Sequence, residues 1–295
     1  MQSSIIGHIV KLKQSYFKID RLQEVKSKLL ISSTENEKIS LDVVGLCLDW
    51  DLNVLISERT EGRLMQLNMT GGVLSKSNFR SEFKNSCGVC INSKKEILVT
   101  DGKLNKIFRF NSNLKLLQII GSYLGTRYGS LNFPWGITTD IENDDSIYVC
   151  DNGNDRILIL TSTGEPKSIF TFESCQHPRK IQIVQDLVYI LHKSENDIFV
   201  SIFDKVTQQL MSSFKQTETN IKSFYVDSSL NLITIGQINH ENFMQNLICT
   251  KKNGQLLFKT VLNTEQIIWD FCFKIIGNEL QMICASNEGV FIFEF

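Results

Sequence analysis

The chain offers few side chains in the arrangements that enzymes use for catalysis. Its histidines, His8, His177, His192 and His240, form no HExxH metal motif, and neither a GxSxG nucleophile elbow nor a phosphate-binding loop is present. Cys87 and Cys90 have the spacing of a zinc knuckle, but structural zinc needs four ligands and no second such pair exists. These residues therefore predict no catalytic centre, no metal site and no cofactor.

The sequence is better equipped to bind a partner. Arginine and lysine neutralise phosphates and carboxylates, while tryptophan and tyrosine stack on unpaired bases and also dominate protein interfaces. Several such residues stand in the loops between apolar runs, and we expect them to gather on one face. This predicted binding face comprises Arg63, Lys106, Arg127, Tyr128, Trp135, Arg156, Arg179 and Lys180.

Arg156 also has a structural interpretation, which we favour over ligand contact. It follows 151–155, Asp-Asn-Gly-Asn-Asp, a run of residues that shape turns. Its planar guanidinium can bridge turn carbonyls or a neighbouring element.

Composition and charge narrow the function classes. The chain has 295 residues, of which 42% are hydrophobic and 21% charged, an ordinary globular balance. With 31 basic and 32 acidic residues it lacks the basic excess of dedicated nucleic-acid-binding proteins. A local basic patch is still compatible with this net charge, because net charge does not report how the charges are distributed. Most of the eight cysteines lie in apolar runs, as reduced core thiols do. Without a secretory signal or a spanning apolar run, we expect a soluble, cytoplasmic protein.

A pattern of three short apolar runs separated by polar turns occurs six times. One residue closes the first apolar run of each unit, and these closing residues follow one another at intervals of 43 to 48 residues. They are Asp49, Asn92, Asp140, Val184, Asp227 and Lys274. Such a period, with several short strands and no helical period, predicts a β-propeller. A fourth run follows in several units, for example at 114–120 and 165–172. The expected fold is therefore all-β, a six-bladed β-propeller of four-stranded blades.

The last unit ends at Phe295 with its third strand, so its outer strand must come from elsewhere. Residues 28–32 precede the first unit and are expected to pair with 290–295 and close the ring. Residues 16–30 also fit a helical period, and this alternative stays open. We therefore divide the chain into an N-terminal segment, 1–40, which supplies the closing strand, and a propeller, 41–295.

The third unit resembles an NHL repeat. The run 133–136, Phe-Pro-Trp-Gly, precedes its first strand, and 151–156, Asp-Asn-Gly-Asn-Asp-Arg, separates its second and third strands, as in that family. Residues 88–110 and 45–67 match less completely, and the last three units keep only the strand pattern. The histidine-leucine pair that names the family is absent from the third unit.

The resemblance implies a role in binding. Domains of this family often stand at the C-terminal end of tripartite-motif ubiquitin ligases, where they recruit protein substrates or single-stranded RNA. This chain contains no RING, B-box or coiled coil. If it is a fragment, ligase activity belongs to the missing part, and if Met1 is the natural start, the chain is a stand-alone adaptor. We expect a non-enzymatic platform that recruits a protein partner, with single-stranded RNA binding in post-transcriptional regulation as the alternative. Neither a membrane nor a small-molecule substrate is expected.

A metal-dependent, lactonase-like hydrolase is the distant alternative. Propeller lactonases place carboxylates, asparagine and histidine around the central channel, and the first runs here carry Asp49, Asp140, Asp227 and Asp270. Aspartates at such places more often shape turns, so we expect no enzyme.

Overall fold

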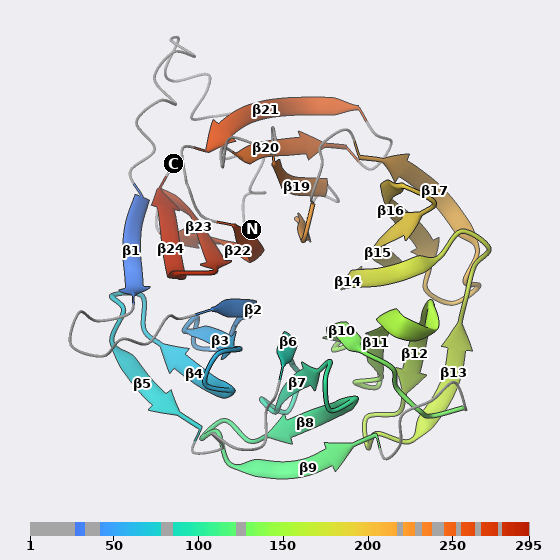
Figure 1. Ribbon diagram of the computed structural model, residues 1–295, viewed down its shortest axis with the longest axis horizontal. Helices are drawn as coiled ribbons and strands as arrows, with labels where there is room; N and C mark the ends of the chain where they lie inside the picture. The colour runs from blue at the N-terminus through green and yellow to red at the C-terminus, as the bar shows by residue number, and fades with distance from the viewer. Residues whose placement is uncertain are drawn as a thin grey trace.

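The computed structural model describes residues 27–32, 42–77, 85–121, 128–216, 221–227, 232–237, 245–251, 255–262, 267–276 and 279–294. Within these ranges the strands form six four-stranded antiparallel sheets, which surround a central axis and run from the axis to the rim (Figure 1). The fold is thus an all-β propeller. No helix in this described part is long and apolar enough to cross a membrane.

The first three blades follow one another along the chain. Blade 1 contains β2 (Val43–Leu48), β3 (Val54–Glu58), β4 (Arg63–Leu67) and β5 (Val73–Lys76). Blade 2 contains β6 (Ser86–Ile91), β7 (Ile97–Asp101), β8 (Lys106–Phe110) and β9 (Leu116–Ile120). Blade 3 contains β10 (Pro134–Thr139), β11 (Ile147–Asp151), β12 (Arg156–Leu160) and β13 (Pro166–Phe170), with the 3-10 turn η2 (Asn152–Asn154) between β11 and β12.

Two further blades and one sheet of mixed origin complete the ring. Blade 4 contains β14 (Gln176–Val184), β15 (Leu187–Ser194), β16 (Asp197–Asp204) and β17 (Leu210–Lys215). Blade 5 contains β18 (Phe224–Val226), β19 (Leu232–Gln237), β20 (Gln245–Thr250) and β21 (Leu256–Leu262). The composite sheet contains β22 (Ile268–Ile276), β23 (Glu279–Ser286), β24 (Gly289–Glu294) and β1 (Ser27–Ser32).

This arrangement corrects the expected count of six blades. In the described part of the chain, five four-stranded blades, not six, consist of consecutive strands. The remaining sheet is completed from the opposite end of the chain, where β1 pairs antiparallel with β24 and Lys28 faces Ile292. This is the pairing expected between 28–32 and 290–295. Strand β1 covers part of the segment with the helical alternative, and residues 16–26 lie outside the described residues.

The order of strands within a blade sets their burial. Every residue of β11 and β12 is buried, because neighbouring sheets cover both faces of the middle strands. The outer strand β5, in contrast, has three exposed residues among its four. Apolar clusters fill the space between adjacent sheets; Leu98 of blade 2, for example, belongs to the same cluster as Leu158 of blade 3. The sheets therefore stabilise one another through stacking.

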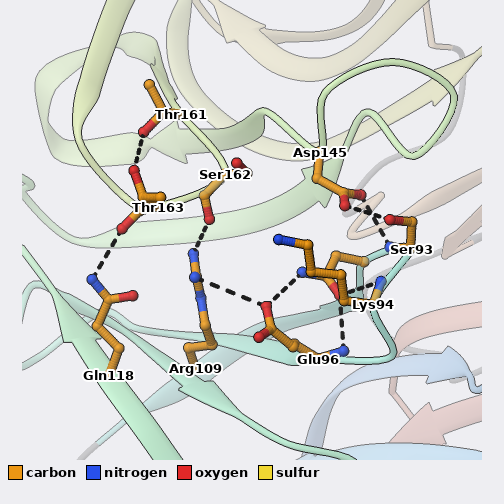
Figure 2. Close-up of polar contacts among 10 residues, drawn as sticks. Ser93, Lys94, Glu96, Arg109, Gln118, Asp145, Thr161, Ser162 and Thr163 are labelled. Carbon is orange, nitrogen blue, oxygen red and sulfur yellow. Dashed lines mark hydrogen bonds and ion pairs between the residues drawn. The ribbon is translucent and has the colours of Figure 1, made fainter.

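Polar contacts also join adjacent blades, as Figure 2 shows for blades 2 and 3. The Arg109 guanidinium on β8 donates to the Ser162 carbonyl oxygen in the loop after β12. Glu96 lies beside it, with a carboxylate oxygen 3.9 Å from a guanidinium nitrogen. The backbone N–H of Ser93 donates to Asp145 at 3.0 Å. Arg109 therefore bridges blades 2 and 3 through its guanidinium.

Candidate anion-binding site at the mouth of the channel

The inner strands begin with a repeated position that lines the channel entrance. In each of the six sequence units, the position five residues before the residue that closes the first apolar run occupies the same place. It lies near the start of the sheet's innermost strand or just before that strand. These six, which we call the mouth ring, are Val44, Cys87, Trp135, Arg179, Lys222 and Trp269. All six line one narrow gap of about 20 Å³. The inner strands that carry most of them surround the centre of Figure 1.

The next residue of each unit forms a second ring, with two different halves. In blades 1 to 3 it is Gly45, Gly88 and Gly136. A Cβ atom on Gly88 would lie 2.6 Å from the Trp135 carbonyl oxygen, and one on Gly136 would lie 2.6 Å from the Arg179 carbonyl oxygen. Glycine at these positions therefore permits neighbouring inner strands to approach closely.

In the other half, the second ring carries Lys180, Ser223 and Asp270. Lys180 Nζ lies 2.6 and 2.7 Å from the two carboxylate oxygens of Asp270, and the Ser223 hydroxyl donates to Asp270 at 2.6 Å. The Leu46 N–H of blade 1 donates to the same carboxylate at 3.2 Å. This cluster joins blades 1, 4 and 5 to the composite sheet and forms a floor beneath the mouth ring.

Cations and indole rings meet in the mouth ring. The guanidinium carbon of Arg179 lies 4.4 Å from the ring centroid of Trp135 and 6.0 Å from that of Trp269. Lys222 Nζ lies 5.6 Å from the Trp269 centroid, and the Arg59 guanidinium carbon lies 5.3 Å from it. Arg59 is paired with Asp42. Among the described residues, neither Arg179 nor Lys222 has a carboxylate within 4.0 Å.

The electrostatics of the mouth ring show uncompensated positive charge. Burial, helped by Arg59, lowers the pKa of Arg179 to about 10. Burial and the neighbouring charges of Arg179 and Lys193 lower the pKa of Lys222 to about 8. Both groups are still mainly cationic at pH 7. The buried Nε of Arg179 and Nε1 of Trp269 have no hydrogen-bond partner in the described part of the chain. An anion would supply both the missing charge and the missing acceptors.

A cavity of about 560 Å³, which we call the mouth cavity, opens beside this ring. Basic and neutral side chains surround it, and none of the described residues that line it is Asp or Glu. The lining residues are Trp135, Asn152, His177, Arg179, Leu191, His192, Lys193, Asn196, Ile198, Ile221 and Lys222. A cavity with three Lys or Arg side chains and no Asp or Glu among its described lining residues can bind an anionic group.

His192 has a structural role in this wall. Its Nδ1 lies 2.9 Å from the Lys193 carbonyl oxygen, and its Nε2 lies 2.7 Å from the Ser201 hydroxyl. Burial lowers the pKa of His192, so the imidazole is neutral at pH 7. His192 and Ser201 are each 1% exposed, and such a buried pair does not present a nucleophile to a substrate.

The structure separates the residues of the predicted binding face. Trp135 and Arg179 meet in the mouth ring, whereas Lys180 lies in the floor. Arg156 is 6% exposed; its Nε lies 2.7 Å from Asp151, and a terminal nitrogen donates to the Ser130 carbonyl oxygen at 2.8 Å. It therefore ties the β11–β12 turn of blade 3 to the connection between blades 2 and 3.

The remaining members lie elsewhere. Arg63 is equally buried, 3.4 Å from Glu58, and Lys106 faces Asp101 across the β7–β8 turn. Tyr128 lines a separate cavity of about 730 Å³ between Gln118 and Pro166 at the rim. Arg127 lies outside the described residues.

Sequence reasoning missed Lys193, Lys222 and Trp269. For Lys222 and Trp269 the signal was present, because both occupy the same position of the repeat as Trp135 and Arg179.

The aspartates in the first apolar runs, which a lactonase-like site would use, shape turns or join strands. Asp49 accepts the N–H groups of Asp51 and Asn53, both at 2.8 Å, and Asp140 accepts from Asn143. In the described part of the chain no three His, Cys, Asp or Glu side chains converge as metal ligands would.

Comparisons with known proteins show the fold and leave the family open. No protein family and no curated protein matches the chain. Among solved structures, a gluconolactonase from Xanthomonas campestris has a TM-score of 0.67 at 14% identity, covering 92% of this chain and 90% of that one. A catalytically inactive virginiamycin B lyase from Staphylococcus aureus with quinupristin has 0.64 at 12% identity, covering 92% and 100%. The WD40 propeller domain of Doa1 has 0.63 at 10% identity, covering 86% and 78%. A propeller is shown, but not specifically an NHL protein.

Proposed function

We propose that the chain is a non-enzymatic binding platform that recruits a protein partner by seating an acidic segment in the mouth cavity. One observation carries the proposal: the described lining combines Arg179, Lys193 and Lys222 with no acidic residue. Because Arg179 and Lys222 have no carboxylate partner in the described residues, an acidic segment would neutralise charge that the fold leaves uncompensated.

A protein segment fits this geometry better than single-stranded RNA does. RNA-binding grooves follow the backbone with a track of cations and present free aromatic faces to successive bases. Here the cations converge on one cavity, and cations already contact the Trp135 and Trp269 rings. Arg156 and Lys180, two members of the predicted binding face, are engaged in ion pairs.

The likeness to NHL repeats supports a finer version of the proposal. In that version the chain is the substrate-recognition part of a cytoplasmic protein of the ubiquitin-ligase family. The likeness of fold to the WD40 domain of Doa1 is compatible with recruitment but is too distant to identify a partner.

Selection from a phage-displayed library of random peptides tests the proposed function. The wild-type chain should enrich peptides rich in Asp and Glu, and a variant with both Arg179→Ala and Lys222→Ala should lose this enrichment. A control with Lys94→Ala and Lys115→Ala removes the same charge from exposed positions and should retain it.

A labelled pool of random single-stranded RNA provides the opposing test. Phosphate contacts weaken steeply as salt rises. RNA binding that persists near physiological salt and requires Arg179, together with failure to select acidic peptides, would overturn the proposal in favour of RNA.

A further inference from the structure

The mouth cavity has features that specify the kind of anion, and the following inference rests on the proposed function. We propose that the mouth cavity is a phosphate-monoester site that binds a phosphoserine or phosphothreonine side chain of the partner, with Arg179 and Lys222 as its main ligands.

The balance of charge favours a dianion. A carboxylate brings one negative charge, whereas a phosphate monoester brings about −1.5 to −2 at pH 7. Arg179 and Lys222 both contact the Trp269 ring, and Lys193 in the same lining adds a third positive charge. Mutual repulsion of these cations contributes to the lowered pKa of Lys222. A dianion relieves this repulsion more fully than one carboxylate does.

The unused hydrogen-bond donors favour the same ligand. Phosphate presents three strong acceptor oxygens. In the described part of the chain the buried Nε of Arg179 and Nε1 of Trp269 lack an acceptor, and Lys222 adds an ammonium group. The Trp135 ring holds the Arg179 guanidinium at 4.4 Å, and this contact through the aromatic ring does not use up its N–H donors.

The floor and the size of the cavity place the ligand. The gap at the channel entrance is about 20 Å³, so it accommodates no more than a water molecule. Asp270 borders this gap, but Lys180 at 2.6 Å neutralises its charge. The phosphate therefore lies above the floor. At about 560 Å³ the mouth cavity has room for the phosphate and for the residues next to it in the partner.

Four labelled peptide pools test the inference by fluorescence polarisation. The pools share degenerate flanking residues and differ at one fixed central position, which is phosphoserine, phosphothreonine, glutamate or serine. The two phosphorylated pools should bind at least about tenfold more tightly than the glutamate pool, and inorganic phosphate should compete. Arg179→Ala and Lys222→Ala should each remove the preference, and Lys115→Ala should keep it.

Arg179→Lys guards against a variant that fails to fold. It retains the charge but loses the planar donor group, so binding of the phosphorylated pools should fall while the unfolding midpoint stays near that of the wild type. Equal binding of the glutamate and phosphorylated pools would overturn the inference and leave the proposed function standing. Binding of RNA or of phosphoinositide vesicles without binding of any peptide pool would overturn both.

Discussion

Replacing Asp270 with alanine removes the carboxylate that accepts hydrogen bonds from Lys180, Ser223 and Leu46 in the floor. Lys180 Nζ lies 2.6 and 2.7 Å from its oxygens, and the two side chains are only 23% and 7% exposed. With an effective dielectric constant of about 20, unit charges about 2.7 Å apart attract by roughly 6 kcal/mol, and desolvation of both ions offsets much of this. Breaking such a pair leaves the other ion buried and typically costs about 3–5 kcal/mol. We therefore expect Asp270→Ala to lower the free energy of unfolding by about 3–5 kcal/mol.

Equilibrium unfolding in urea, followed by tryptophan fluorescence, measures this loss. A double-mutant cycle with Lys180→Met separates the ion pair from the other hydrogen bonds of Asp270, and the double variant should be destabilised by less than the sum of the single variants. Asp186→Ala is the matched control: its side chain is 84% exposed, so we expect a change within about 0.5 kcal/mol. A loss below about 1 kcal/mol for Asp270→Ala, or a coupling energy near zero, would refute the argument that this pair holds the sheets together.

Arg156→Ala will lower the free energy of unfolding by about 3 kcal/mol near pH 7, because it leaves the buried Asp151 carboxylate without its ion-pair partner. Burial raises the pKa of Asp151, and Arg156 opposes this rise. Without Arg156, the Asp151 carboxylate therefore binds a proton more readily in the folded state than in the unfolded state. The loss measured by urea unfolding should therefore shrink as the pH falls toward about 4.5. Lys222 has its pKa lowered from 10.5 to about 8, so between these values the folded chain binds fewer protons than the unfolded chain and gains stability as pH rises. Between about pH 7.5 and about pH 9.5, Lys222→Met should therefore gain less stability with rising pH than Lys115→Met, which retains Lys222. Burial raises the pKa of Cys87 to about 12, with similar effects at other buried thiols, so an aromatic disulfide reagent should label few of the eight free cysteines in the folded chain and all eight in urea.

The sequence pattern predicted the propeller because every unit has the same physical requirement, which is to bury both faces of its sheet. Each set of short strands must bury two faces against its neighbours, so the spacing of the closing residues reports the architecture. In the third unit, for example, β10 ends at Thr139, directly before Asp140, the residue that closes the first run in the sequence. The period reveals how many units the sequence contains, however, and not how many blades consist of consecutive strands. Six units of sequence do not yield six contiguous blades. The last three runs acquire their fourth strand by a pairing across nearly the whole chain.

The binding residues were harder to identify, because Arg156, Arg179 and Lys180 look alike in the sequence. Their roles are set by where a carboxylate lies. Asp151 reaches Arg156 across a tight turn, Asp270 reaches Lys180 from a sheet far along the chain, and no described carboxylate reaches Arg179. Only the first of these pairings is local enough to be inferred from spacing. Comparison of the six units position by position would have assigned Lys222 to the site.

The composite sheet also has a consequence for the order in which the ring is built during synthesis. Strand β1 ends at Ser32 and its partner β24 begins at Gly289, so at about 5–20 residues per second roughly 13–50 s separate their synthesis. Blades 1 to 5 pair consecutive strands and can stack as they are made, while the outer edge strand β1 waits for a partner. An unpaired strand is a template for other chains. Closure is therefore the last event in the assembly of the ring, and the interval before it is when a nascent chain is most exposed to pairing with another copy of itself.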